Sequence, residues 1–415
     1  MRLSDILKKL LLLTIFLLPL LGAYKDFGYE QIKVLFFILS ISLISFVWLL
    51  QKPDIKLSEI GKTAAVFILI LFLISITGLD FKTSFLGNPP YFQGLLVYSY
   101  LFLFCLLVKS FDIKLKTYAI AFNFSALIVS SRAIQDWVLQ NAGYIVPDYA
   151  GRVVSSFGQP NFYAGFLLLT LPFSYLLYKG KNHKLSYFGL ISALISVAGI
   201  FVSFSRSAIL LSLILIALGL IDQLKIKRSW IVFTSVIILI SSLIGLKFSS
   251  GFIGSEFSKP FSTNNPDLIT QGVEKRVYLW PIFLKIGLQK PLAGYGLNNI
   301  SVAYSDYFKK NKHLLFEENL NISPILIGLK DLTVDSSHSY ILDLMLFSGI
   351  FGVLSWMLLV FLLLKKILSS DITLENDTLL LGLLTYLIWI QFQNQSIVQL
   401  IYFWFLVGAI DKGID

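Results

Sequence analysis

The chain has 415 residues, of which 56% are apolar and only 14% charged, and its mean hydropathy is +0.78. Apolar runs of this length exclude an ordinary water-soluble domain and predict an all-α polytopic membrane protein. A formal net charge of +10 would suggest nucleic acid as the partner of a soluble protein, but the basic residues fall mainly in short loops between apolar segments. We therefore expect a lipid bilayer and no nucleic acid as partner, and we attribute the charge to membrane topology.

About twelve apolar segments are long enough to cross a bilayer. We predict transmembrane helices near residues 10–24, 31–50, 63–79, 94–110, 117–137, 161–178, 185–204, 207–222, 229–247, 339–364, 378–391 and 396–410. The first resembles a signal peptide, but no small-residue cleavage site is convincing, so we expect a membrane anchor. Residues 1–248 would hold helices 1–9, residues 249–337 one large polar loop, and residues 338–415 helices 10–12.

Alternate loops carry most of the basic residues, and this bias orients the chain. One set contains Lys52, Lys56, Lys62, Lys109, Lys114, Lys116, Lys179, Lys181, Lys184, Lys225, Lys227, Arg228, Lys365 and Lys366, with Arg2, Lys8, Lys9 and Lys412 near the two ends. The opposite set has only scattered basic residues. We therefore predict a multi-pass protein of the cytoplasmic (inner) membrane with both termini in the cytoplasm and the large loop outside.

The large loop is long for an unstructured connection, which favours a functional cap. Residues 251–265 are rich in Ser, Pro and Asn, and we expect them to be irregular. Residues 276–288 are apolar with basic residues at intervals, so they predict an interfacial helix with Pro281 near a start or a kink. Pro291, Gly294 and Gly296 then predict a turn that ends this helix.

Several kinds of chemistry lack their sequence signature. The chain has no phosphate-binding loop of the GxxxxGK[ST] type, no paired-aspartate motif for a metal-bound nucleotide sugar and no His/Cys/Asp cluster with metal-ligand spacing. The single cysteine, Cys105, lies inside an apolar run and predicts an inert buried thiol. We therefore expect a reaction that needs neither metal nor cofactor.

Three arginines and one histidine are the candidate functional residues. Arg152 precedes a predicted span, Arg206 lies in a tight break between two spans, Arg276 opens the interfacial segment, and His338 stands where the large loop re-enters the membrane. Guanidinium groups match phosphate geometry and stay charged, so an outward cluster suits a lipid pyrophosphate. The alternatives are headgroup anchors for Arg152, Arg276 and Trp280, and a structural role for His338.

These motifs resemble, in order, those of the O-antigen ligase superfamily. The matching stretches are Leu86–Gly94, Arg152–Asn161, Ser205–Ala208, Arg276 with Trp280, Pro291–Gly296, and His338 with Gly349–Gly352, and the family-like signature region covers about 185–355. The chain departs from the family pattern at three positions. It has Ser339 where the family usually has Asn, Phe347 near the position where the family often has Glu, and Ser207 where the turn usually has Gly. The likeness covers residues 85–355 in scattered pieces.

The resemblance implies a membrane enzyme that transfers a glycan from undecaprenyl pyrophosphate to an acceptor hydroxyl outside the cytoplasmic membrane. Arg206 and Arg276 would stabilise the pyrophosphate leaving group, and His338 would orient or deprotonate the acceptor hydroxyl. Substrate binding would involve Arg152, Asn161, Trp280, Gly294 and Gly296. The acceptor could be a lipid, a growing glycan or a protein, which leaves ligase, polymerase and protein O-oligosaccharyltransferase open. A transporter of lipid-linked glycans or small solutes is the alternative from another class.

Overall fold

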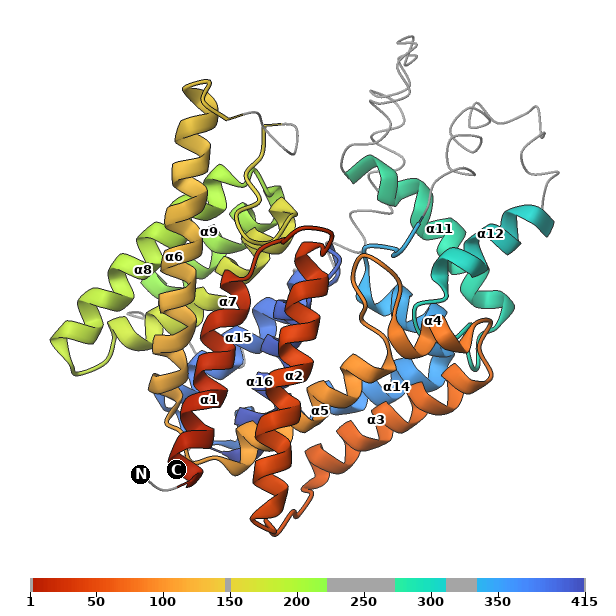
Figure 1. The fold of residues 1–415 in the computed structure, drawn as a ribbon, viewed down its shortest axis with the longest axis horizontal. Coiled ribbons are helices and arrows are strands. Elements are labelled where there is room, and N and C mark those ends of the chain that lie inside the picture. The colour runs from red at the N-terminus through yellow and green to blue at the C-terminus, as the bar shows by residue number, and fades with distance from the viewer. Residues whose placement is uncertain (1–2, 146–150, 222–272, 311–333, 414–415) are drawn as a thin grey trace.

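The computed structural model describes residues 3–145, 151–221, 273–310 and 334–413 (Figure 1). These residues form helices and connecting loops, with no strand beyond an isolated bridge between Tyr24 and Phe27. The helices are α1 (Leu3–Leu17), the 3-10 helix η1 (Leu18–Leu20), α2 (Tyr29–Leu50), α3 (Glu59–Ile76), α4 (Phe81–Leu86), α5 (Leu95–Ser110), α6 (Leu115–Asn141), α7 (Pro160–Tyr178), α8 (His183–Val202), α9 (Arg206–Ile221), α11 (Val273–Gln289), α12 (Ile300–Lys310), α14 (Tyr340–Ser369), α15 (Leu374–Trp389) and α16 (Ile397–Lys412).

A helix overlaps every predicted span except 229–247, which lies outside the described residues, as do residues 251–265 of the large loop. Six helices in the described ranges are long and apolar enough to cross a membrane: α2, α3, α6, α7, α8 and α14. The chain is thus a multi-pass membrane protein, while the total of twelve spans remains a prediction. The first helix begins earlier than predicted and ends at Leu17, just before the short 3-10 helix that contains Pro19.

Helices α7 and α16 form the centre of the bundle. Almost every residue of α16 is buried, as expected for a sequence that is apolar on all sides. Small residues allow the neighbouring helices to approach α7 closely. A Cβ atom at Gly165 would lie 2.7 Å from the Trp389 ring, and one at Gly189 would lie 2.6 Å from the Ser174 carbonyl oxygen. These close contacts hold α8 and α15 against α7.

Both chain termini lie at one end of the bundle, which we call the terminal end (Figure 1). Asp411, near the end of α16, has a side chain only 2% exposed and lies 2.8 Å from Lys109 of α5. Ser58, before α3, donates a hydrogen bond to the same carboxylate, and Lys366 of α14 donates to the Asp411 carbonyl at 2.5 Å. Burying a carboxylate costs free energy unless it is paired and hydrogen-bonded. This network ties four helices together at the terminal end.

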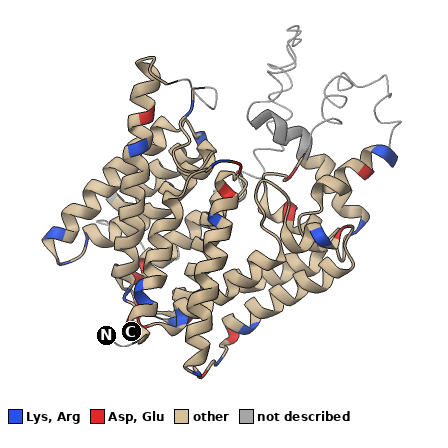
Figure 2. Ribbon diagram, in the orientation of Figure 1, with Lys and Arg blue, Asp and Glu red and all other residues tan. Residues whose placement is uncertain are grey.

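The opposite end of the bundle, the distal end, is held together by a separate set of contacts. Lys33, at the start of α2, is fully buried and donates to the Ser156 carbonyl at 2.5 Å. Glu30, one turn earlier, accepts a hydrogen bond from the Ile397 backbone at the start of α16, at 2.8 Å. Figure 2 shows the charged residues gathered mostly near helix ends and loops, with the middle of the bundle nearly free of them. The two ends are therefore chemically distinct.

Part of the large loop inserts into a break in α14. Gly349, inside this helix, has φ 59° and ψ −157°, so the predicted span 339–364 is not a continuous helix. The backbone N–H groups of Tyr295 and Gly296 donate to the carbonyls of Leu346 and Phe347, at 2.8 and 3.0 Å. The predicted turn after α11 is confirmed, and it uses its positive-φ glycines to dock on the interrupted helix.

This docking predicts a large effect on stability for Gly294→Ala. Gly294 has φ +63°, and a Cβ atom there would lie 2.6 Å from the Leu346 carbonyl oxygen. Gly143 is a matched control because it also has positive φ (+79°) but no neighbour within 4 Å. Alanine in the left-handed region costs about 1–2 kcal/mol, so Gly143→Ala should lower stability by about that amount and Gly294→Ala by clearly more. Thermal unfolding of the purified variants in detergent measures both, and equal losses would contradict the docking.

Candidate functional site

His338 lies in a short loop that is tied to the start of α14. Asp343, in the first turn of this helix, accepts hydrogen bonds from the Ser337 backbone N–H and the Ser336 hydroxyl, both at 2.7 Å. A carboxylate at this position is favoured by the unpaired N–H groups and the dipole of a helix N-terminus. The backbone N–H of His338, a residue with φ 59°, donates to Ser336 Oγ at 2.9 Å. The loop thus holds a half-buried histidine in a defined conformation at the distal end.

Helix α11 contacts this histidine loop through Trp280. The indole Nε1–H donates to the carbonyl of Ser337 at 2.8 Å. The interfacial helix predicted over 276–288 is confirmed as a helix, with Pro281 inside it. Arg276 belongs to the same helix, one turn before Trp280, but its side chain lies outside the described part of the structure. Trp280 therefore joins α11 directly to Ser337, the residue next to His338.

Arg152, Asn161 and the Arg206 turn form a second group. The Arg152 guanidinium donates to the Ser203 carbonyl at 2.9 Å through Nε and to Asn161 Oδ1 at 3.0 Å through Nη2. Ser203 caps the end of α8, and the turn continues through Ser205 to Arg206, the first residue of α9. Arg206 is exposed. Arg152 thus fixes the turn that presents Arg206, and part of its hydrogen-bonding capacity is used for that purpose.

A segment whose role was not predicted from the sequence joins the His338 loop to the Arg206 turn. Residues 391–395 connect α15 to α16 and contain four side-chain amides. Gln393 Nε2 donates to Ser207 Oγ at 3.2 Å, and the Asn394 amide oxygen lies 2.5 Å from Ser336 Oγ. This amide segment therefore bridges the Arg206 turn and the His338 loop. The sequence pattern that could have pointed to this segment is four side-chain amides among five residues, between two apolar runs.

The buried pair of Glu30 and Lys33 was also not predicted from the sequence. The Lys33 ammonium lies 4.9 Å from the centroid of the Phe157 ring, in the loop between Arg152 and Asn161. Its hydrogen bond to Ser156 and the contact of Glu30 with α16 connect that loop to the rest of the distal end. The sequence pattern that could have revealed this pair is an acidic and a basic residue three positions apart, which places both on one face of a helix.

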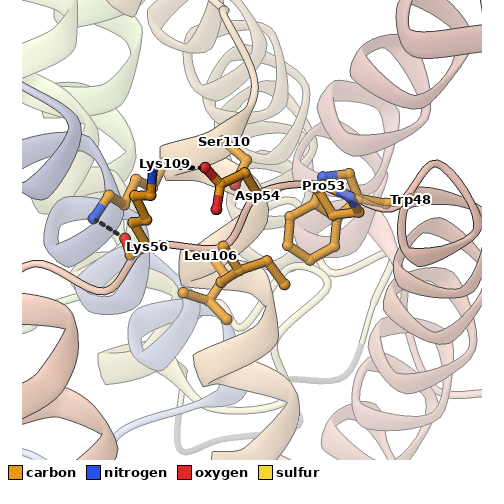
Figure 3. Close-up of a pocket in the computed structure, with 8 residues that line it drawn as sticks. Trp48, Pro53, Asp54, Lys56, Leu106, Lys109 and Ser110 are labelled. Atoms are coloured by element: carbon orange, nitrogen blue, oxygen red, sulfur yellow. Dashed lines mark hydrogen bonds and ion pairs between the residues drawn. The ribbon is translucent and has the colours of Figure 1, made fainter.

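Two cavities in the described part of the chain differ in position and lining. One, of about 310 Å³, lies at the terminal end between α2, α5 and the loop after α2 (Figure 3). It is lined by Trp48, Leu106 and the ion pair of Lys56 with Asp54, and by none of the candidate residues. The other, of about 50 Å³, lies beside the His338 loop at the distal end. The candidate residues do not line the smaller cavity either, but it adjoins His338 through Ser336, which contacts the His338 backbone.

Comparison with known proteins supports the same region. Residues 191–357 match a family model described as O-Antigen ligase, and this range includes Arg206, Arg276 and His338. The chain is 26% identical over 374 residues to the ComP-specific O-oligosaccharyltransferase of Acinetobacter baylyi. That match covers 89% of this chain and 60% of the relative, so the chain spans about three-fifths of the relative's length. Together with the ordered motifs and the apolar helices, these matches support the resemblance to the O-antigen ligase superfamily.

Proposed function

We propose that the protein is a membrane glycan transferase that moves a glycan from undecaprenyl pyrophosphate to an acceptor hydroxyl at the outer face of the cytoplasmic membrane. The observation that carries this proposal is the connected set of contacts at the distal end. Trp280 contacts the loop of His338, Asn394 and Gln393 link that loop to Ser207, and Arg152 contacts the same turn. In this proposal Arg206 is the cationic group and His338 the proton acceptor, and these contacts connect the two segments that carry them.

The donor side of the reaction requires positive charge. When the bond between the anomeric carbon and the phosphate oxygen breaks, negative charge grows on the lipid pyrophosphate, and fixed cations lower the barrier. Arg206 is exposed at the start of α9, where the helix dipole adds to its positive potential. Arg276 is proposed to share this role, with Asn161, Gly294 and Gly296 in the substrate site. Because the pyrophosphate is already an activated leaving group, the proposal includes neither metal nor nucleotide.

The acceptor side requires removal of one proton. In the proposed step the neutral His338 imidazole takes the proton of the acceptor hydroxyl as its oxygen attacks the anomeric carbon, and undecaprenyl pyrophosphate leaves. The new glycosidic bond replaces the broken bond to phosphate, so no oxidant or reductant is needed. The contacts of Ser336, Ser337 and Asp343 hold the histidine loop in place for this step.

The alternative of a transporter predicts ionisable residues near the midplane of broken helices. Figure 2 instead shows the charges mostly near helix ends, and the buried groups Glu30, Lys33 and Asp343 all lie in the first turns of their helices at the distal end. This distribution favours an enzyme. Deleting the gene distinguishes the enzyme types: loss of all attached glycan indicates a ligase or protein transferase, and attachment of single repeats indicates a polymerase.

The proposed orientation predicts which positions a membrane-impermeant thiol reagent reaches from outside. In a background with the buried Cys105 replaced by Ala, a cysteine at Gln159, at the distal end, should be labelled in intact cells. A cysteine at Lys181, in the loop between α7 and α8 at the terminal end, should be labelled only after the membrane is broken. Labelling at Lys181 in intact cells would contradict the orientation.

A further inference from the structure

The distal cavity beside the His338 loop has a lining suited to a neutral ligand. It lies between the loop before α5, the turn before α12, the start of α14 and residues 393–395 of the amide segment. Its described lining combines five side-chain amides, two carboxylates and four aromatic rings, with no lysine, arginine or histidine. A pyrophosphate placed there would meet carboxylates without a cation to balance it. The cavity is therefore chemically distinct from the arginines proposed to bind the donor.

Hydrogen bonds to the backbone hold the cavity walls in place. Gln93 donates to the Gln395 carbonyl at 2.8 Å, and Asn298 donates to the Gln93 carbonyl at 2.7 Å. Asn88 in turn donates to the Asn298 carbonyl at 2.5 Å. These contacts join segments that are some 200 to 300 residues apart in the sequence. The cavity is thus built before any ligand arrives, which lowers the entropic cost of binding.

Three polar groups of the lining, from three segments of the chain, interact with one another. The Tyr91 phenol interacts with the Asp335 carboxylate and the Asn394 amide. Its ring packs edge-on against Phe162, with 5.7 Å between the two ring centroids. Burial raises the pKa of the Asp335 carboxyl and also that of the Tyr91 phenol, which lies beside Asp335. Asn394 also contacts Ser336, whose hydroxyl accepts from the His338 backbone. The group therefore adjoins the proposed proton acceptor.

The size and number of these groups indicate the class of ligand. A cavity needs about 10–15 Å³ for one water, so about 50 Å³ holds a few hydroxyl groups and not a whole oligosaccharide. A single serine or threonine hydroxyl, about the size of one water, would fill only a fraction of this volume. The edge of a sugar ring carries several hydroxyls that donate and accept, and its apolar face suits aromatic neighbours.

We infer that this cavity binds the hydroxyl-bearing edge of a neutral sugar on the acceptor, with Tyr91, Asp335 and Asn394 as its recognition groups. The role as acceptor site rests on the proposed transfer reaction, whereas the binding of a sugar does not. On this account the acceptor is a glycan or a glycolipid, and the cavity places one hydroxyl next to the His338 loop.

Sugar binding can be measured directly on the full chain purified in detergent. The probes are methyl glycosides of glucose, galactose and mannose, observed by saturation-transfer NMR, with cyclohexanol and inorganic pyrophosphate as comparison probes. We expect at least one glycoside to receive saturation from the wild-type protein and not to be displaced by pyrophosphate. Tyr91→Phe, which removes only the hydroxyl, should weaken the binding of that glycoside about 5- to 10-fold, and Asn394→Leu should abolish it.

Thermal unfolding shows which variants are folded. If Asn394→Leu does not fold, Tyr91→Phe still tests the site, because its ring keeps the packing against Phe162. Absence of glycoside binding by the wild type, or equal binding by folded Tyr91→Phe, would overturn the sugar site. Preferential binding of a serine-containing peptide would overturn it in favour of a protein acceptor. Glycan transfer by Arg206→Ala is measured in parallel: normal transfer with cavity-dependent sugar binding would remove the proposed pyrophosphate role and leave the sugar site standing.

Discussion

Arg206→Ala is expected to reduce glycan transfer by about 100-fold or more, the loss found when one preorganised electrostatic donor is removed from an active site. Arg206 is exposed at the start of α9, in a turn held by the contacts of Arg152 with Ser203 and of Gln393 with Ser207. Its removal therefore leaves the supporting hydrogen bonds intact and takes away only the charge. Arg206→Lys should restore part of the activity, because an ammonium supplies charge without the planar fork of a guanidinium.

Arg132→Ala is the matched control for this substitution. Arg132 is an exposed arginine of α6, near the same end of the bundle, and its contact with Asp136, at 4.0 Å, is a weak surface ion pair. We expect this variant to transfer glycan at a rate close to that of the wild type. Initial rates of glycan transfer by the purified variants, at saturating lipid-linked donor, compare the two. Near-normal transfer by Arg206→Ala would remove Arg206 from the mechanism.

The second large effect is expected for His338→Ala. General-base catalysis contributes about 10² to 10⁴-fold, so this variant should lose most of its transfer activity while still binding the lipid-linked donor. The loop itself should persist, because Ser336, Ser337 and Asp343 hold it, and the contact of His338 with Ser336 is made by the backbone N–H. Separate measurements of donor binding and single-turnover transfer test both parts of this prediction.

The proton transfer also predicts a dependence on pH. Histidine ordinarily has a pKa of about 6.5, and the protonated ring cannot accept the acceptor proton. Transfer by the wild type should therefore fall as the pH is lowered below this range, and the residual rate of His338→Ala should lack this fall. His183→Ala is the control, because His183 is exposed at the terminal end. Normal turnover and an unchanged pH profile in His338→Ala would reduce His338 to a structural residue.

The sequence predicted most helices because their apolar runs are long and their ends carry ordinary signals. It did not predict the break in α14, since Gly349 stands in an apolar run without proline, and residues 291–296 dock at this break. The short helices α4 and α12 were likewise missed. The docking contacts at the break in α14 join segments far apart in the chain, and hydropathy does not report them.

For the site, the sequence placed Arg152, Arg206 and His338 on the same side of the membrane but could not show what connects them. The connections are single hydrogen bonds over long separations, such as Trp280 with Ser337 and Gln393 with Ser207. The Gln391–Gln395 segment carried a visible signal, four amides between two apolar runs, that became meaningful only when its partners were known. Contacts of this kind depend on helix packing and are invisible to local patterns.

The central claim is that this chain transfers a glycan from a lipid pyrophosphate without a metal. The most direct test supplies the purified protein with an isotopically labelled glycan on undecaprenyl pyrophosphate. The acceptor is envelope material extracted from cells that lack the gene, and EDTA is present throughout. We predict that the label moves to the envelope material in step with release of undecaprenyl pyrophosphate, and that Arg206→Ala and His338→Ala nearly abolish both. Label that remains on the lipid with the wild-type protein, or transfer that EDTA abolishes, would contradict the claim.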